Sequence, residues 1–199
     1  MSAPAVRIVA VSVGAAQPLR INDRLTVLSG IVKQPVAGPV AAGRMGLHGD
    51  EQADLSVHGG LQKAVYAYPQ EHLPFWRAQR LERGLDVPDA LPPGFMGENL
   101  LLQGLLEQDL WVGDELHVQG SDCVLRVTAP REPCYKLNAV MGFAQATRLM
   151  AQQVRTGWYL AVDVPGELAA GMDLRLVPGP RRLSLAEAVQ AKWAKHRNG

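Results

Sequence analysis

Cysteine is scarce in this chain of 199 residues, which contains only Cys123 and Cys134. Two thiols cannot form the disulfide framework on which small secreted domains depend. The first residues lack the basic, apolar and small-residue regions of a signal peptide, and no apolar run approaches the roughly 20 residues of a transmembrane helix. We therefore expect a cytoplasmic protein, in which both cysteines remain thiols unless a metal or a reaction uses them.

An excess of charge of one sign is also missing. The formal net charge is +1, and aromatic residues make up only 6% of the chain. Duplex nucleic acids and anionic membranes attract strongly basic surfaces, and single strands need aromatic platforms, so we expect no nucleic-acid and no membrane partner. With 47% hydrophobic and 20% charged residues, the composition is that of an ordinary globular protein, and the length suits one large domain or a domain with a small appendage.

Short β-rich runs, separated by glycine and proline, dominate the chain. Such runs predict a barrel or sandwich rather than a doubly wound sheet, in which strands and helices alternate. The expected strands cover residues 6–13, 26–32, 64–68, 99–102, 115–118, 124–128, 158–164 and 174–177.

Three segments have helical patterns, at residues 70–83, 138–155 and 185–195. Asn138 is a possible cap of the second, and Ser184 and Glu187 have the spacing of a capping box before the third. Residues 85–95 contain three prolines and are expected to form a loop. We predict a mainly β (α+β) fold, with a barrel domain at 1–180 and a short C-terminal helical tail at 181–199 packed on it.

Cys134 is the most informative residue, because it follows Pro133 in a stiff turn and has two cations nearby, Arg131 and Lys136. Adjacent positive charge favours the thiolate, which attacks electrophiles and binds metals. The alternative is an inert buried thiol, since free cysteine is among the most buried residue types. Cys123 shares strand parity with its apolar neighbours, and core packing is the better interpretation for it.

A glycine pair provides a second candidate group. His58 precedes Gly59 and Gly60, whose backbone amides could face an anion, and Lys63 could add a charge. A tight turn between strands is the alternative. Asn99 enters an apolar strand and could hydrogen-bond a polar heterocycle, or simply complete a turn. The spacing of histidines and cysteines argues against a classical structural zinc site, and P-loop and dinucleotide-binding motifs are absent.

Five blocks in this order resemble the MOSC-domain family, which is named for the C-terminal domain of molybdenum-cofactor sulfurases. They are GLHGD at 46–50, VHGG at 57–60, GENL at 97–100, VGD at 112–114 and PREPCYKL at 130–137. The chain looks most like the YiiM-like, stand-alone bacterial branch, over about residues 8–190. The resemblance implies an irregular MOSC-type β-barrel with a few peripheral helices, which agrees with the pattern of short strands. The family also carries a label for pyridoxal phosphate binding.

The resemblance further implies a molybdenum cofactor, a pterin that holds the metal, with Cys134 as the protein ligand of the molybdenum. The family's arginine and histidine beside the cysteine are assigned to Arg131 and His58, although Arg44 is an alternative to Arg131. From chemistry alone, cofactor contacts are expected at Gly59, Gly60, Lys63, Asn99 and Lys136.

The branch is associated with reducing N-hydroxylated base analogues such as 6-N-hydroxylaminopurine, which would make this chain a detoxifying oxidoreductase. Its substrate would be a small molecule, and a separate flavin-type reductase would supply electrons, because the sequence has no nucleotide motif. A monomer or a homodimer is compatible with this activity. Two alternatives remain: a carrier of the molybdenum cofactor or of sulfur without turnover, and an interaction module with an inert Cys134.

Overall fold

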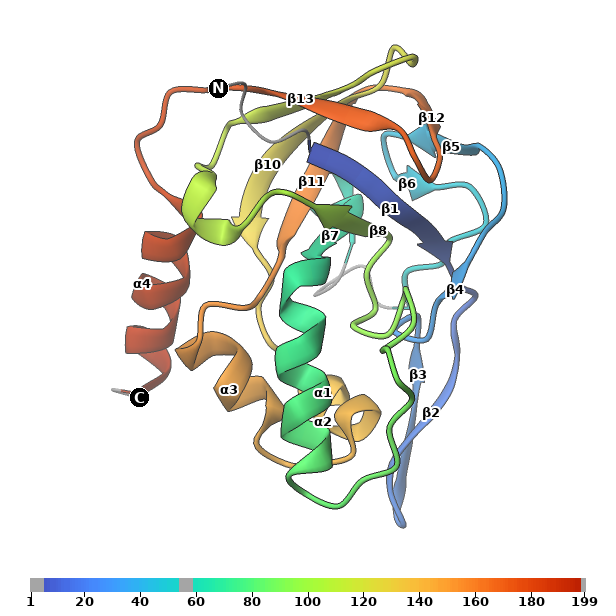
Figure 1. Ribbon diagram of the computed structural model, residues 1–199, viewed down its shortest axis with the longest axis vertical. Coiled ribbons are helices and arrows are strands. Elements are labelled where there is room, and N and C mark those ends of the chain that lie inside the picture. Colours follow the sequence, from blue (N-terminus) through green and yellow to red (C-terminus); the bar gives the residue numbers. More distant parts are fainter. Residues whose placement is uncertain (1–5, 54–58, 198–199) are drawn as a thin grey trace.

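The structure, a computed structural model, describes residues 6–53 and 59–197, and its largest feature is a closed barrel of seven strands (Figure 1). Around the barrel the order is β13, β9, β10, β11, β7, β8 and β1, and β1 pairs with β13 to close the ring. All pairings are antiparallel except that of β7 with β8. The strands are β1 (Val6–Val13), β7 (Val65–Pro69), β8 (Leu100–Gln103), β9 (Glu115–Val118), β10 (Val124–Pro130), β11 (Trp158–Val164) and β13 (Asp173–Val177).

Six further strands lie outside the ring. β4 (Gln34–Pro35) pairs with the end of β1. A small sheet is formed by β12 (Gly166–Leu168), β5 (Val40–Gly43) and β6 (Gly46–Leu47), with β5 in the middle. β2 (Gln17–Asn22) forms a hairpin with β3 (Leu25–Ser29). The predicted barrel is confirmed, since seven expected segments coincide with its strands. The expected strand at 26–32 is instead one arm of the hairpin and ends at Ser29. The other five were not predicted, because β4, β5, β6 and β12 have only two to four residues and β2 is mostly exposed.

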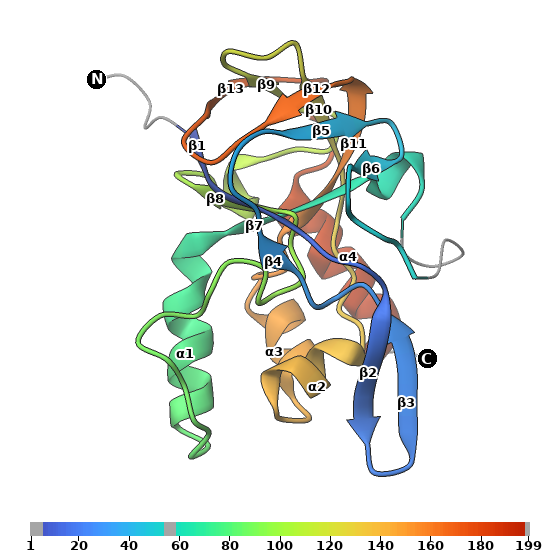
Figure 2. The same cartoon turned by 90° about the vertical axis from the view of Figure 1, so that its right-hand side faces the viewer.

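The helices pack around one end and one side of the barrel (Figures 1 and 2). They are α1 (Leu73–Leu81), α2 (Lys136–Met141), α3 (Ala146–Gln152) and α4 (Leu185–Arg197), with short 3-10 turns at η1 (Leu61–Lys63), η2 (Gln70–His72) and η3 (Glu107–Asp109). No helix in the described part of the chain is both long and apolar enough to cross a lipid bilayer. α4 packs against β10 and α3, and Leu185 reaches the barrel core.

The predicted helix at 138–155 is wrong as one element. Gly142 ends α2 in a left-handed conformation with φ of 77°, which glycine adopts without steric cost, and α3 starts separately. Asn138 does not begin a helix either, because α2 already starts at Lys136. Its Oδ1 instead accepts from the Thr147 amide at 3.0 Å, in the first turn of α3. The capping box is confirmed: the Ser184 amide donates to Glu187 Oε2 at 2.9 Å, and the Glu187 amide donates to Ser184 Oγ at 3.2 Å.

Two apolar layers follow from the period of two along the strands. β7 is buried on both faces, with Val65 and Ala67 inside the barrel and Tyr66 and Tyr68 outside it, against the helices. On β11, Leu160 points inward and Tyr159 points outward in the same way. The alternation therefore presents tyrosines on the outer surface of the barrel, where the candidate site lies.

Candidate functional site

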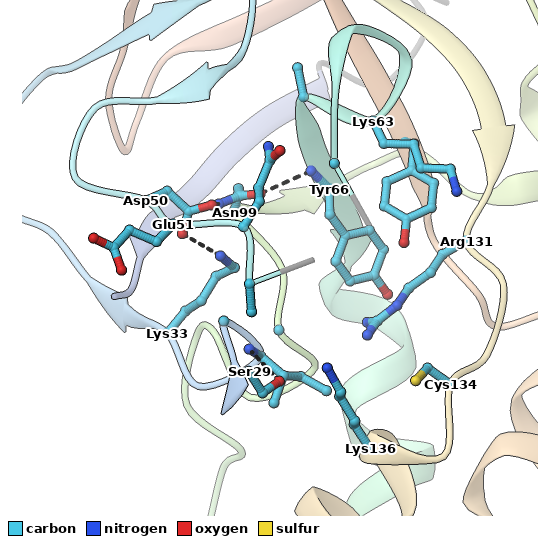
Figure 3. A pocket seen from close by; sticks show the side chains of 18 residues that line it. Ser29, Lys33, Asp50, Glu51, Lys63, Tyr66, Asn99, Arg131, Cys134 and Lys136 are labelled. Atoms are coloured by element: carbon cyan, nitrogen blue, oxygen red, sulfur yellow. Dashed lines mark hydrogen bonds and ion pairs between the residues drawn. The ribbon is translucent and has the colours of Figure 1, made fainter. Parts of the chain in front are cut away.

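A cleft lies outside the barrel, between β7, β11, the β3–β4 loop and the loop that joins β10 to α2 (Figure 3). The empty space in it amounts to about 660 Å³, including the part that is open to solvent. Its main polar lining residues are Ser29, Lys33, Asp50, Glu51, Lys63, Tyr66, Asn99, Arg131, Cys134, Lys136 and Tyr159. Among the described lining residues, basic side chains outnumber acidic ones, so the cleft favours anionic or electron-rich ligands.

Arg131 forms one wall of the cleft together with two tyrosines. Tyr66 and Tyr159 are directly opposite on β7 and β11, with ring centroids 5.7 Å apart. The Arg131 guanidinium stacks 4.4 Å from the centroid of Tyr66, and its Nη1 donates to the Met96 carbonyl at 2.5 Å. Burial opposes its charge, but the Tyr66 and Tyr159 hydroxyls and Cys134 raise the pKa of Arg131 above its ordinary value. Arg131 is thus a permanent, fixed cation.

Cys134 lies in the loop between β10 and α2, and its half-buried thiol faces the same cleft as Arg131. Its carbonyl accepts from the Leu137 amide at 2.8 Å, where the chain enters α2. Lys136 also lines the cleft, and its ammonium donates to the Leu28 carbonyl at 3.2 Å. The two cations expected near Cys134 therefore share its cleft. Arg44, the alternative arginine, is exposed between β5 and β6 and does not line it.

Of the glycine pair, Gly59 lines the cleft and Gly60 does not. The Gly60 amide donates to Gln52 Oε1 at 3.0 Å. Gly59 has φ of 107°, and a Cβ there would lie 1.9 Å from the same oxygen, so glycine is required. Lys63 lines the cleft with its ammonium 5.5 Å from the Tyr159 ring centroid. His58 lies outside the described residues.

Asn99 also lines the cleft, and most of its polar atoms serve the protein. Its Nδ2 donates to the Ser12 carbonyl at 3.2 Å and to Asp50 Oδ2 at 2.9 Å, and its Oδ1 accepts from the Tyr66 amide at 3.0 Å. Asn99 therefore ties β1, β7 and β8 together beneath the cleft. Within residues 6–53 and 59–197, the Tyr66 amide is the one donor that contacts Asn99 Oδ1.

Sequence reasoning missed Lys33 and assigned no role to Asp50. Lys33 follows β3 without any motif, and only the fold shows that its side chain is buried in the cleft and paired with Asp50. Asp50 does belong to the GLHGD block, which was a signal that could have placed it at the site. Cys123 agrees with its predicted role, since it is 1% exposed in the barrel core and burial raises its pKa to about 11.

Glu98 is fully buried behind Arg131, and it organises the loop that Arg131 contacts. Its carboxylate accepts from the amides of Gly94 at 2.6 Å and Met96 at 3.0 Å. Burial raises its pKa from the ordinary 4.5 to about 7, although these amides and Arg131 oppose the shift. Glu98 is therefore partly ionised near neutral pH.

This shift predicts a pH-dependent stability. The folded protein holds the Glu98 proton more tightly than the unfolded protein does. The contribution of this proton to stability is therefore fully present below pH 4.5 and is lost as the pH rises through about 7. A shift of this size corresponds to about 3 kcal/mol. When the free energy of unfolding is measured in urea, its fall between pH 4.5 and pH 8 should be about 3 kcal/mol larger for wild type than for Glu98→Gln. Equal losses in both proteins would contradict the prediction.

The donors in the cleft fit a molybdenum cofactor. A thiol is a soft ligand suited to such a metal, and nearby cations suit an anionic pterin. Among the described residues no cluster of three or more histidine, cysteine or acidic side chains could bind a metal ion. Cys134 would then be the metal's protein anchor, with the rest of the coordination supplied by the cofactor itself.

Comparisons with known proteins converge on one family. A model of the MOSC domain matches residues 54–175. Protein YiiM of Escherichia coli K12 is 34% identical over 165 residues, 83% of this chain and 71% of that protein. A Gibberella moniliformis protein named reductase is 34% identical over 154 residues, 77% of this chain but 26% of that protein. The crystal structure of YiiM from Geobacillus stearothermophilus matches with a TM-score of 0.73 and 29% identity, covering 96% of this chain and 85% of that one.

Proposed function

The chain belongs to the MOSC domain family, and from this membership we propose that it is a molybdenum-cofactor-dependent reductase of N-hydroxylated compounds such as 6-N-hydroxylaminopurine. A function associated with the molybdenum cofactor follows from the family, and the relative named reductase supports an oxidoreductase activity. The observation that carries the proposal is the meeting of Cys134 and Arg131 in one cationic cleft.

Four residues of the cleft have roles in this proposal. Cys134 anchors the metal through its thiolate, and Lys63 and Lys136 meet the pterin's phosphate. Arg131 presents its planar fork to oxygen atoms of the bound ligand, and the stack on Tyr66 fixes its direction. The cofactor supplies the two-electron chemistry when bound, and the protein supplies orientation and electrostatics.

The overall reaction is R–NH–OH plus two electrons and two protons, giving R–NH2 and water. A separate flavin-type reductase delivers the electrons. His58 is assigned to proton donation, since imidazole titrates near neutral pH, and this role remains a prediction from the sequence.

The test is a turnover assay with protein made in a host that synthesises the cofactor, a flavin reductase, NADPH and 6-N-hydroxylaminopurine. Wild type and Cys123→Ala should form adenine, and Cys134→Ala should not. Cys123 is the matched control because it is the chain's other cysteine and lies in the barrel core. Cofactor binding without turnover on any N-hydroxylated compound would favour the carrier function. Equal turnover by Cys134→Ala would remove the site assignment.

A further inference from the structure

Lys33 is a buried lysine in the cleft that the roles above leave unused. It follows β3 and is 8% exposed. Figure 3 shows Lys33 and Asp50 on one side of the cleft, with Arg131 and Cys134 on the other. A lysine is almost never buried unless it is paired, and the pairing here is with Asp50.

The partner of Lys33 is held in place by other elements. Asp50 Oδ1 accepts from the Gly14 amide at 3.0 Å as well as from the Lys33 ammonium, and Oδ2 accepts from Asn99 at 2.9 Å. The backbone of Lys33 is also confined, because a Cβ at Gly94 would lie 2.7 Å from the Lys33 carbonyl. The ammonium is therefore presented to the cleft from a rigid support.

The ammonium of Lys33 has hydrogen-bond donors to spare. An ammonium carries three N–H donors and accepts nothing. Within the described part of the chain, Asp50 Oδ1 is the single acceptor that Lys33 Nζ contacts. Two N–H groups thus remain at the cleft wall. Leaving buried charged donors unpaired is costly, so this position favours a ligand that brings an acceptor atom.

The groups around Lys33 have opposing effects on its pKa. Burial lowers the pKa of Lys33, Arg131 lowers it further, and Asp50 and Glu98 oppose the shift. Asp50 is the contact partner, so the pair retains its ionic hydrogen bond. The cation is poorly solvated, which strengthens any hydrogen bond it donates to a ligand.

We propose that Lys33 distinguishes the N-hydroxylated substrate from its amine product by donating a hydrogen bond to the hydroxyl oxygen. The inference rests on the proposed function. Substrate and product differ by this one oxygen, and the amino group left after reduction offers N–H donors where the ammonium needs an acceptor. A site built to hydrogen-bond a hydroxyl discriminates strongly against the analogue that lacks it. Loss of the contact also assists release of the amine.

The experiment measures binding rather than turnover. Cofactor-loaded protein without an electron donor is titrated with 6-N-hydroxylaminopurine and with adenine, and the ratio of the two dissociation constants is compared among variants. Lys33→Met should reduce the wild-type preference for the hydroxylated compound by about ten- to hundredfold, the range for a hydrogen bond from a charged group. Lys33→Arg keeps donors and charge, and should retain most of the preference.

Lys192→Met is the matched control, because Lys192 is also paired with a carboxylate, that of Glu132, but does not line this cleft. Its preference should equal that of wild type. Equal weakening of both ligands by Lys33→Met, or no preference in wild type, would overturn the inference. Preferential binding by wild type without reduction would overturn the proposed reductase activity and leave the role of Lys33 standing.

Discussion

Arg131→Met is expected to lower the free energy of unfolding by about 2–4 kcal/mol. The change removes the hydrogen bond from a charged donor to the Met96 carbonyl and the stack on Tyr66, and both are buried. It also leaves the Met96 oxygen without this donor. Urea unfolding of wild type and variant measures the difference. Arg44→Met is the control, since Arg44 is exposed outside the cleft and should change stability by less than about 0.5 kcal/mol.

The same substitution should slow alkylation of Cys134 by iodoacetamide at pH 8. In a Cys123→Ala background Cys134 is the only thiol left to react. Loss of the neighbouring cation should reduce its alkylation rate, because adjacent positive charge favours the attacking thiolate. The Arg44→Met control should react like its parent. An unchanged rate in Arg131→Met would show that the cation does not act on the thiol.

Glu107→Ala is expected to lower the free energy of unfolding by about 3–5 kcal/mol, although Glu107 does not line the cleft. Its carboxylate is 2% exposed, accepts from the Gly157 amide at 2.7 Å and contacts His72 Nε2 at 2.8 Å. Arg155 has only donors, so His72 Nδ1 accepts from it and Nε2 carries the proton toward Glu107. Truncating the glutamate therefore leaves two buried donors unpaired.

The loss should extend to the site, because the turn that Glu107 anchors also supports the cleft wall. The Thr156 carbonyl accepts from Tyr66 Oη at 2.8 Å, and the Gly157 carbonyl accepts from the Arg131 amide at 3.2 Å.

The matched control is Glu115→Ala, which removes another glutamate that contacts a histidine, His117, at 2.8 Å but is half-exposed. It should cost no more than about 1 kcal/mol. Chemical unfolding of both variants gives the comparison, and equal losses would show that burial does not set the energy of these pairs.

The barrel was predictable because its strands are apolar and separated by turn residues. The β2–β3 hairpin was harder to predict, since its residues are mostly exposed and have no buried face that would reveal a period of two. The break at Gly142 was missed because one glycine inside a helical pattern is often tolerated, and here its left-handed φ ends the helix. For the hairpin a burial pattern was missing, and for the helix break the backbone conformation of one glycine was missing.

Some residues of the site could be predicted from a local motif, and others are brought together only by the tertiary fold. Cys134 and Arg131 could be singled out from one short motif, because proline and charge act locally in the chain. Lys33 and Asp50 could not be paired from the sequence, since they meet only after the β3–β4 loop folds against the loop that follows β6. The hydrogen bonds that Asn99 and Gly60 form within the protein are likewise tertiary contacts, and no spacing rule predicts them.

The most direct test of the central claim is elemental analysis for molybdenum on protein produced in a host that makes the cofactor. Wild type and Cys123→Ala should contain nearly one molybdenum per chain, and Cys134→Ala should contain almost none. Molybdenum in all three proteins would keep the cofactor but remove Cys134 as its anchor. Its absence from wild type in a competent host would contradict the account as a whole.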